Sequence, residues 1–115
     1  MGRPIQKIAI IGGITMEKIA LITGGTRGIG KEIALELAKN NYSVVINYRT
    51  KTEDLLKLEE EVNNLGVQCL LVKADVSNFD ECKNMVDTIS EKFGRLDVLV
   101  NNAGITKDNL ILRMR

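Results

Sequence analysis

A turn rich in glycine is the feature of the sequence best suited to chemistry. Gly24, Gly28 and Gly30 stand between an apolar run and a helix-like run, in the order T-G-x-x-x-G-I-G from Thr23. A helix that begins at such a turn offers unpaired N–H groups and a partial positive charge to an anion. Because glycine has no Cβ, the backbone can approach that anion closely. The turn therefore predicts binding of a dinucleotide through its pyrophosphate, although an ordinary tight turn could also use glycine.

The segments around this turn alternate between strand-like and helix-like patterns. Short apolar runs predict strands, and apolar residues that recur every three or four positions predict amphipathic helices. The expected strands are 18–23, 42–48, 67–76 and 95–104, and the expected helices are 28–41, 52–66 and 77–94. This alternation is typical of right-handed βαβ crossovers in a parallel sheet. The predicted fold class is therefore α/β, a Rossmann-type doubly wound parallel sheet with its four strands in the order 3-2-1-4.

Local features refine the three expected helices. Ile29 begins an apolar repeat at helical spacing, and Phe79 is expected on the inward face of the third helix. Ser77 followed by Asp80 predicts a capping box at the start of that helix. Gly66 predicts the end of the second helix, since glycine favours the position just past a helix C-terminus.

Composition excludes several classes of partner. The formal net charge is +1, from 16 basic and 15 acidic residues, and aromatic residues make up 3% of the chain. Neither a basic surface for phosphates nor a set of aromatics for stacking on bases is expected, so no nucleic-acid partner is predicted. No apolar run approaches the ~20 residues of a membrane span. Cys69 and Cys82 have no metal-site spacing and the chain has no histidine, so both are expected as reduced thiols in a cytoplasmic protein.

Residues 1–15 do not fit the alternating scheme. The stretch KIAIIGGIT at 7–15 echoes KIALITGGT at 18–26, but no helical crossover separates the two. Parallel neighbours need such a crossover. The stretch is therefore interpreted as an extension of uncertain origin before a domain that begins at Met16. An extra strand at a sheet edge and an antiparallel hairpin through Gly12–Gly13 are the alternatives.

Four stretches together resemble one protein family. TGGTRGIG at 23–30, ADVSN at 74–78 and LDVLVNNAG at 96–104 are similar to motifs of the short-chain dehydrogenase/reductases, and the resemblance covers Met16 to Met114. The stretch GITKDNLILRM at 104–114 resembles the 3-oxoacyl-[acyl-carrier-protein] reductase subfamily in particular. This resemblance implies an NADPH-dependent reductase of fatty-acid synthesis, acting on an acyl-carrier-protein thioester. It also implies an oligomer, as is usual in the family.

The resemblance also implies roles for individual residues. Asp75 would accept a hydrogen bond from the adenine amino group, with Val76 beside the ring; a helix-entry acid near Ser77 is the local alternative. Residues 102–104 would lie near the nicotinamide, and Asn101 would hold neighbouring backbone in place. Together with residues at the end of the second expected strand, the predicted cofactor-binding set is Gly24, Thr26, Arg27, Gly28, Ile29, Gly30, Asn47, Tyr48, Arg49, Asp75, Val76, Asn102, Ala103 and Gly104.

The end of the second expected strand indicates which nicotinamide cofactor is bound. NAD-selective sites carry Asp or Glu there to hold the ribose 2′-hydroxyl. This strand ends with Asn47, Tyr48, Arg49 and Thr50, without a carboxylate. Arg49 and Arg27 can instead hold a 2′-phosphate through forked, charge-assisted hydrogen bonds. We therefore expect NADP rather than NAD.

The catalytic residues of the resembled family are the part that the sequence lacks. That family uses a serine and a Tyr-x-x-x-Lys pair for general acid–base chemistry. Neither Tyr42 nor Tyr48 is followed by lysine four positions later. The expectation is a Rossmann domain at 16–115 that is incomplete at its C-terminus and inactive alone. A non-catalytic nucleotide-binding module, or a structural fragment without turnover, is the alternative.

Overall fold

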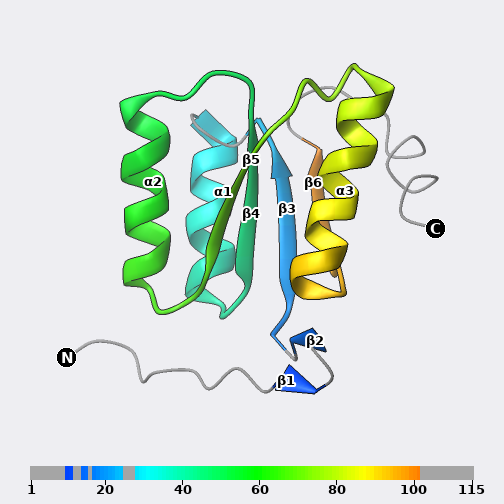
Figure 1. Cartoon of the computed structure of the whole chain (residues 1–115). Coiled ribbons are helices and arrows are strands. Elements are labelled where there is room, and N and C mark those ends of the chain that lie inside the picture. The colour runs from blue at the N-terminus through cyan, green and yellow to red at the C-terminus, as the bar shows by residue number, and fades with distance from the viewer. Residues whose placement is uncertain (1–9, 12–13, 16, 25–27, 102–115) are drawn as a thin grey trace.

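The main sheet of the molecule is parallel and four-stranded. The computed structural model describes residues 10–11, 14–15, 17–24 and 28–101. The strand order is β5-β4-β3-β6, which confirms the predicted order 3-2-1-4 (Figure 1). The strands are β3 (Ile19–Thr23), β4 (Ser43–Tyr48), β5 (Cys69–Lys73) and β6 (Val98–Asn101), and the helices are α1 (Gly28–Lys39), α2 (Glu53–Asn64) and α3 (Phe79–Phe93).

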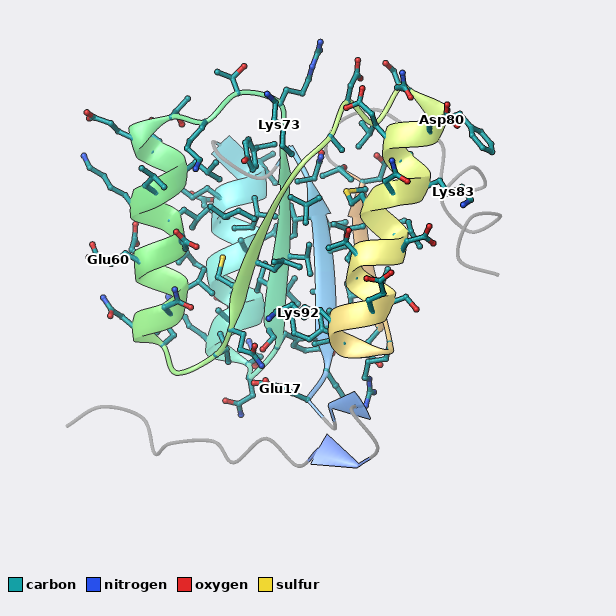
Figure 2. All side chains as sticks on the ribbon, viewed as in Figure 1. Glu17, Glu60, Lys73, Asp80, Lys83 and Lys92 are labelled. Carbon is teal, nitrogen blue, oxygen red and sulfur yellow. The ribbon has the colours of Figure 1, made fainter. Side chains whose placement is uncertain are left out.

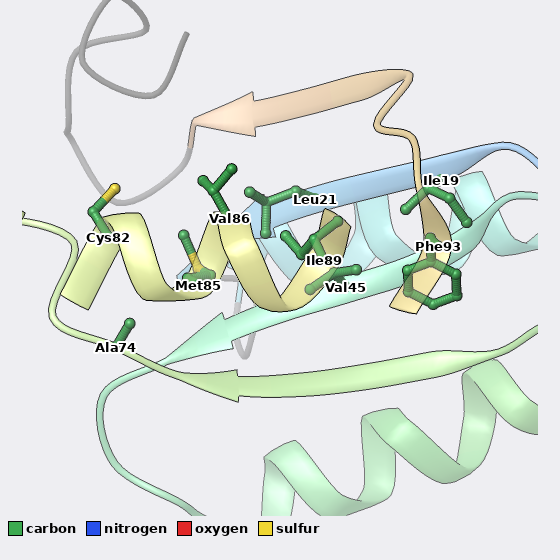
Figure 3. Packing of buried hydrophobic residues seen from close by; sticks show 9 residues of the cluster. All are labelled: Ile19, Leu21, Val45, Ala74, Cys82, Met85, Val86, Ile89 and Phe93. Atoms are coloured by element: carbon green, nitrogen blue, oxygen red, sulfur yellow. The ribbon is translucent and has the colours of Figure 1, made fainter. Parts of the chain in front are cut away.

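Alternate residues of the central strands build two apolar layers, one on each face of the sheet. On one face Ile19, Leu21 and Val45 pack with the buried side of α3 (Figure 3). On the other face Ile22 and Ile46 pack with α1 and α2. Every residue of β3 is buried, whereas β5 and β6 at the two edges are half-buried, apart from the exposed Lys73 at the end of β5. Helices on both faces explain why β3 and β4 are continuous apolar runs rather than alternating ones.

Of the two predictions about helix ends, the structure confirms one and contradicts the other. Gly66 has a positive φ of 89° just past α2, which confirms the predicted stop. The predicted capping box of Ser77 and Asp80 is wrong. Asn78 is the N-cap of α3, and its Oδ1 accepts a hydrogen bond from Glu81 N at 3.0 Å. Ser77 lies one residue before this N-cap, and its hydroxyl donates to Asp75 Oδ1 at 2.6 Å instead.

Two apolar residues of the predicted helical repeats are exposed. Phe79, predicted to point inward, is 60% exposed, and Ile29 is 69% exposed. Both stand in the first turn of their helix, where the Cα–Cβ bond tilts toward the helix N-terminus. Their side chains therefore point past the end of the helix rather than onto the sheet. The helical spacing is correct, but the helix starts too close to these residues for them to reach the core.

The N-terminal stretch contains a hairpin separate from the main sheet. β1 (Ile10–Ile11) pairs with β2 (Ile14–Thr15) in antiparallel fashion, with Gly12–Gly13 between them. This confirms the hairpin alternative. In the described part of the chain neither strand joins the four-stranded sheet, so these residues supply no extra edge strand. Of the helices that the structure describes, none is long and apolar enough to cross a membrane.

Candidate functional site

The carboxyl edge of the parallel sheet collects the residues singled out by the sequence. Thr23 at the end of β3 is in register with Asn47 of β4 on one side and Asn101 of β6 on the other. The glycine turn follows β3 in the sequence, and its Gly28 is the first residue of α1. Figure 2 shows Lys73, the last residue of β5, at this edge and Glu17 at the opposite one. An open parallel sheet characteristically binds its ligands at this edge.

The two described glycines at the ends of the glycine turn, Gly24 and Gly28, have backbone angles that favour glycine. Gly24 and Gly28 have positive φ angles of 63° and 60°, a region where residues with a Cβ are strained. Apart from its chain neighbours and the nearby backbone of α1, no atom of the described chain lies within 4 Å of a Cβ built at Gly28, so that position faces open space. The first turn of α1 contains no acidic residue to oppose an anion. Thr26 and Arg27 of the predicted site lie outside the described residues.

Three predicted site residues stand at the end of β4 or just after it, and they differ in exposure. The side chain of Asn47 is buried, and its Nδ2 donates to the carbonyl oxygen of Ala74 at 2.9 Å. Tyr48 is half-buried against the core on the α1 and α2 side. Arg49, with a side chain 76% exposed, is the member of this group that extends into solvent. The side chain of Asn47 thus lies beneath the surface that a ligand would contact.

Asp75 stands beside Arg49, although 26 positions separate them in the sequence. Asp75 Oδ1 accepts hydrogen bonds from the Ser77 hydroxyl at 2.6 Å and the Ser77 amide at 3.0 Å. Asp75 Oδ2 lies 3.8 Å from Arg49 Nη2. The two Ser77 bonds, and then the charge of Arg49, hold the pKa of Asp75 below its ordinary value. The predicted helix-entry contact with Ser77 therefore exists, and it leaves Oδ2 on the side of Arg49.

The ends of β3 and β6 are tied together by their polar side chains. The Thr23 hydroxyl donates to the carbonyl oxygen of Val100 at 3.3 Å and lies 3.5 Å from Asn101 Oδ1. Thr23 is fully buried, so these contacts replace water for its hydroxyl. They hold the start of the glycine turn against the end of β6. Asn102, Ala103 and Gly104 of the predicted site follow β6 and lie outside the described residues.

Glu81 belongs to this edge and was missed by the sequence reasoning. Its Oε1 accepts a hydrogen bond from the backbone N–H of Asp75 at 2.9 Å. A signal for it existed, because Asn78 and Glu81 have the spacing of a capping box. The sequence reasoning placed that box one residue too early, on Ser77 and Asp80, and so overlooked Glu81.

A second polar cluster lies at the amino edge, away from the glycine turn. Asp97 Oδ2 accepts a hydrogen bond from Ile19 N at 2.8 Å, and Asp97 Oδ1 lies 2.6 Å from Arg95 Nη2. The Arg95 side chain and the Ile19 amide hold the pKa of Asp97 below its ordinary value. These contacts fix the start of β3 and do not belong to the candidate site. A small hollow at the same end of α3 is lined by Val86, Ile89, Ser90, Gly94, Arg95 and Leu96.

Comparison with known proteins agrees with this geometry. The family model for short chain dehydrogenases matches residues 18–115. The 3-oxoacyl-[acyl-carrier-protein] reductase FabG of Staphylococcus epidermidis is 47% identical over 100 residues, covering 87% of this chain and 41% of that protein. The 3-oxoacyl-[acyl-carrier-protein] reductase of Synechocystis is 45% identical over 98 residues, covering 85% of this chain and 40% of its own length.

Solved structures show the same likeness. A short-chain dehydrogenase/reductase from Serratia marcescens superimposes with a TM-score of 0.71 at 34% identity, over 76% of this chain and 36% of that one. A 3-oxoacyl-[acyl-carrier protein] reductase from Brucella melitensis gives a TM-score of 0.70 at 34% identity, over 78% of this chain and 35% of its own. The matched part of the chain therefore spans less than half the length of each of these relatives.

Proposed function

The chain belongs to the short-chain dehydrogenase family, and we propose that it is the NADPH-binding part of a 3-oxoacyl-[acyl-carrier-protein] reductase. The observation that carries the proposal is the open space at Gly28, in a turn with positive φ angles at the start of α1. A backbone of this shape at a helix N-terminus can approach a pyrophosphate closely. Identity of 47% to a 3-oxoacyl-[acyl-carrier-protein] reductase supports the finer assignment.

Different site residues would contact different parts of the cofactor. Gly24, Gly28 and Gly30, with the first N–H groups of α1, would hold the pyrophosphate. Asp75 and Val76 would lie along the adenine, and residues 102–104 near the nicotinamide. Asp75 fits this role because Ser77 occupies its Oδ1 and leaves Oδ2 at the open edge. Ile29, 69% exposed at the start of α1, would present its backbone to the same ligand.

The choice of NADPH over NADH rests on the end of β4. No carboxylate stands there, and the guanidinium of Arg49 is 3.8 Å from the Asp75 carboxylate. An exposed ion pair of this length contributes little. A ribose 2′-phosphate would offer Arg49 shorter, forked hydrogen bonds. Arg27, in the glycine turn, is the second proposed phosphate contact.

The proposed reaction is reduction of a β-ketoacyl thioester carried by acyl carrier protein. The bound cofactor would supply the hydride, and a proton donor would be needed at the carbonyl oxygen. Tyr42 and Tyr48 are the only tyrosines of the chain, and neither begins a Tyr-x-x-x-Lys pair. We therefore expect the 115-residue chain to bind NADPH without turnover. Cys69 and Cys82 do not form a disulfide with each other, which suits a cytoplasmic setting for the proposed enzyme.

A charge-matched pair of variants tests the cofactor assignment. In the variant Arg27→Ala/Arg49→Ala the affinity for NADPH should fall much more than the affinity for NADH, because only NADPH carries the 2′-phosphate. The variant Lys51→Ala/Lys57→Ala removes the same charge from exposed positions near this edge and should change both affinities little. An equal loss for the two cofactors in the arginine variant would contradict the assignment.

A further inference from the structure

The peptide unit between Ala74 and Asp75 is held by side chains from both sides. Its carbonyl oxygen, that of Ala74, accepts a hydrogen bond from Asn47 Nδ2 at 2.9 Å. Its N–H, that of Asp75, donates to Glu81 Oε1 at 2.9 Å. Asn47 belongs to β4 and Glu81 to α3, so two different elements fix the plane of one peptide. The direction in which the Asp75 side chain leaves the backbone depends on that plane.

Asn47 places a polar side chain in an apolar part of the sheet, and burial of its amide costs free energy. It is 2% exposed and follows the apolar residues Val44, Val45 and Ile46 in the most buried part of the sheet. A buried amide without hydrogen bonds costs free energy, and an apolar residue would suit the strand better. Asn47 Nδ2 also lies 3.5 Å from the carbonyl oxygen of Val72. The backbone N–H of Ala74 is separately bound to Tyr48 O at 3.0 Å, so Asn47 adds a contact that the strand pairing does not supply.

Glu81 makes an unusual contact for its position. It is the third residue of α3, where a glutamate ordinarily reaches back to the N–H of the N-cap residue. That N–H, of Asn78, instead donates to the carbonyl oxygen of Asp75 at 2.9 Å. The carboxylate of Glu81 is thereby directed further back along the chain, to Asp75 N. Both unusual contacts, of Asn47 and of Glu81, end on the same peptide.

We infer that Asn47 and Glu81 are positioning residues, which orient the Asp75 carboxylate at the cofactor site by clamping the Ala74–Asp75 peptide. This inference rests on the proposed function for the claim that a cofactor uses that orientation. It assigns Asn47 a part in cofactor binding through backbone that it holds, rather than through direct contact. It also adds Glu81 to the residues on which affinity depends.

Two substitutions with matched controls test the clamp. Asn47→Ala and Glu81→Ala each remove one side of it, and Glu81→Gln keeps an oxygen that can accept the Asp75 N–H. Ser43→Ala is the control for Asn47, because Ser43 is buried in the same strand and its Oγ accepts from Gln68 N at the opposite edge. Asp80→Ala is the control for Glu81, since it removes an exposed acid from the same turn of α3.

Two readouts separate positioning from general stability. The first is hydrogen exchange of the Asp75 amide, which should become about tenfold faster in Asn47→Ala and Glu81→Ala and stay unchanged in both controls. The second is the dissociation constant for NADPH, which should rise about fivefold to tenfold in the same two variants. Glu81→Gln should resemble the unsubstituted chain in both measurements. Thermal unfolding of Ser43→Ala should shift without a change in either readout.

Each outcome decides a separate claim. Unchanged exchange and unchanged affinity in Asn47→Ala and Glu81→Ala would overturn the inference, as would a Glu81→Gln variant that behaves like Glu81→Ala. If the unsubstituted chain does not bind NADPH, the proposed function fails. Hydrogen exchange of the Asp75 amide, which needs no ligand, then still tests whether Asn47 and Glu81 clamp the peptide. The claim that the clamp affects NADPH affinity would fail together with the proposed function.

Discussion

Replacing Gly28 with alanine distinguishes a turn shaped for a ligand from a turn shaped only for folding. The φ of Gly28 is 60°, and apart from its chain neighbours and the nearby backbone of α1, nothing in the described chain lies within 4 Å of an added Cβ. The cost to folding is therefore backbone strain alone, about 1–2 kcal/mol for a left-handed conformation. Alanine also restricts the unfolded chain, which returns about 0.4–1 kcal/mol. A net loss of about 1 kcal/mol should lower the Tm by about 4–8 °C.

Binding of NADPH should suffer more than this strain accounts for. The added methyl group would occupy the space through which a pyrophosphate would approach, so we expect the Kd to rise by more than about tenfold. Gly94→Ala is the matched control, because Gly94 has a φ of 73° at the C-cap of α3. It should lower the Tm by a similar amount and leave the Kd unchanged.

The assay is a fluorescence titration of each variant at a temperature well below its Tm, preceded by a thermal melt. A Gly28→Ala variant that keeps the Kd of the unsubstituted chain would refute the reasoning about the turn. Equal weakening by Gly28→Ala and Gly94→Ala would refute it as well, since it would show that only stability matters.

Further predictions concern the titrating and reactive groups. Arg95 and the Ile19 amide lower the pKa of Asp97 in the folded chain. The ionised Asp97 therefore adds to the free energy of unfolding above the pKa of an unfolded aspartate, near 3.9, and this addition is lost as pH falls through the lower folded pKa. Asp97→Asn, at a partly exposed site, should therefore cost about 1–2 kcal/mol in urea unfolding at about pH 7 and less at about pH 3; an equal cost at both would contradict this. Ser77→Ala should raise the pKa of Asp75 toward its ordinary value, since the Ser77 hydroxyl contributes most to lowering it; an NMR titration without a shift would contradict this. Burial raises the pKa of Cys69 to about 12, so iodoacetamide should modify Cys69 only as the chain unfolds, and rapid labelling of the folded chain would be the contrary result.

The fold was predictable because its signals are local and repeated. The apolar runs of β3 and β4 lie between helix patterns that cover both faces, and these features predict a parallel sheet, whose order follows from the usual order of a Rossmann-type sheet. The glycine turn was predictable for the same reason, since the positive φ angles of Gly24 and Gly28 favour glycine over residues with a Cβ. The exposed first-turn residues Ile29 and Phe79 were not, because spacing does not say where a helix begins relative to the core.

Most side-chain contacts of the candidate site could not be predicted from the sequence. Asn47 was predicted as part of the cofactor surface because it stands at a strand end, but alternation along β4 turns its side chain inward. The approach of Arg49 to Asp75 depends on the register of β4 with β5, which no local pattern specifies. Glu81 reaches Asp75 only because the helix begins at Phe79 and Asn78 is the cap, one residue later than predicted.

The most direct test of the account is a fluorescence titration of the purified chain with NADPH and, separately, with NADH. The chain contains no tryptophan, so the emission of the reduced cofactor can be followed without interference from the protein. Saturable binding with a clear preference for NADPH is the predicted result. Absence of saturable binding to either cofactor, or a preference for NADH, would contradict the proposal that the glycine turn, Arg27 and Arg49 form an NADPH site.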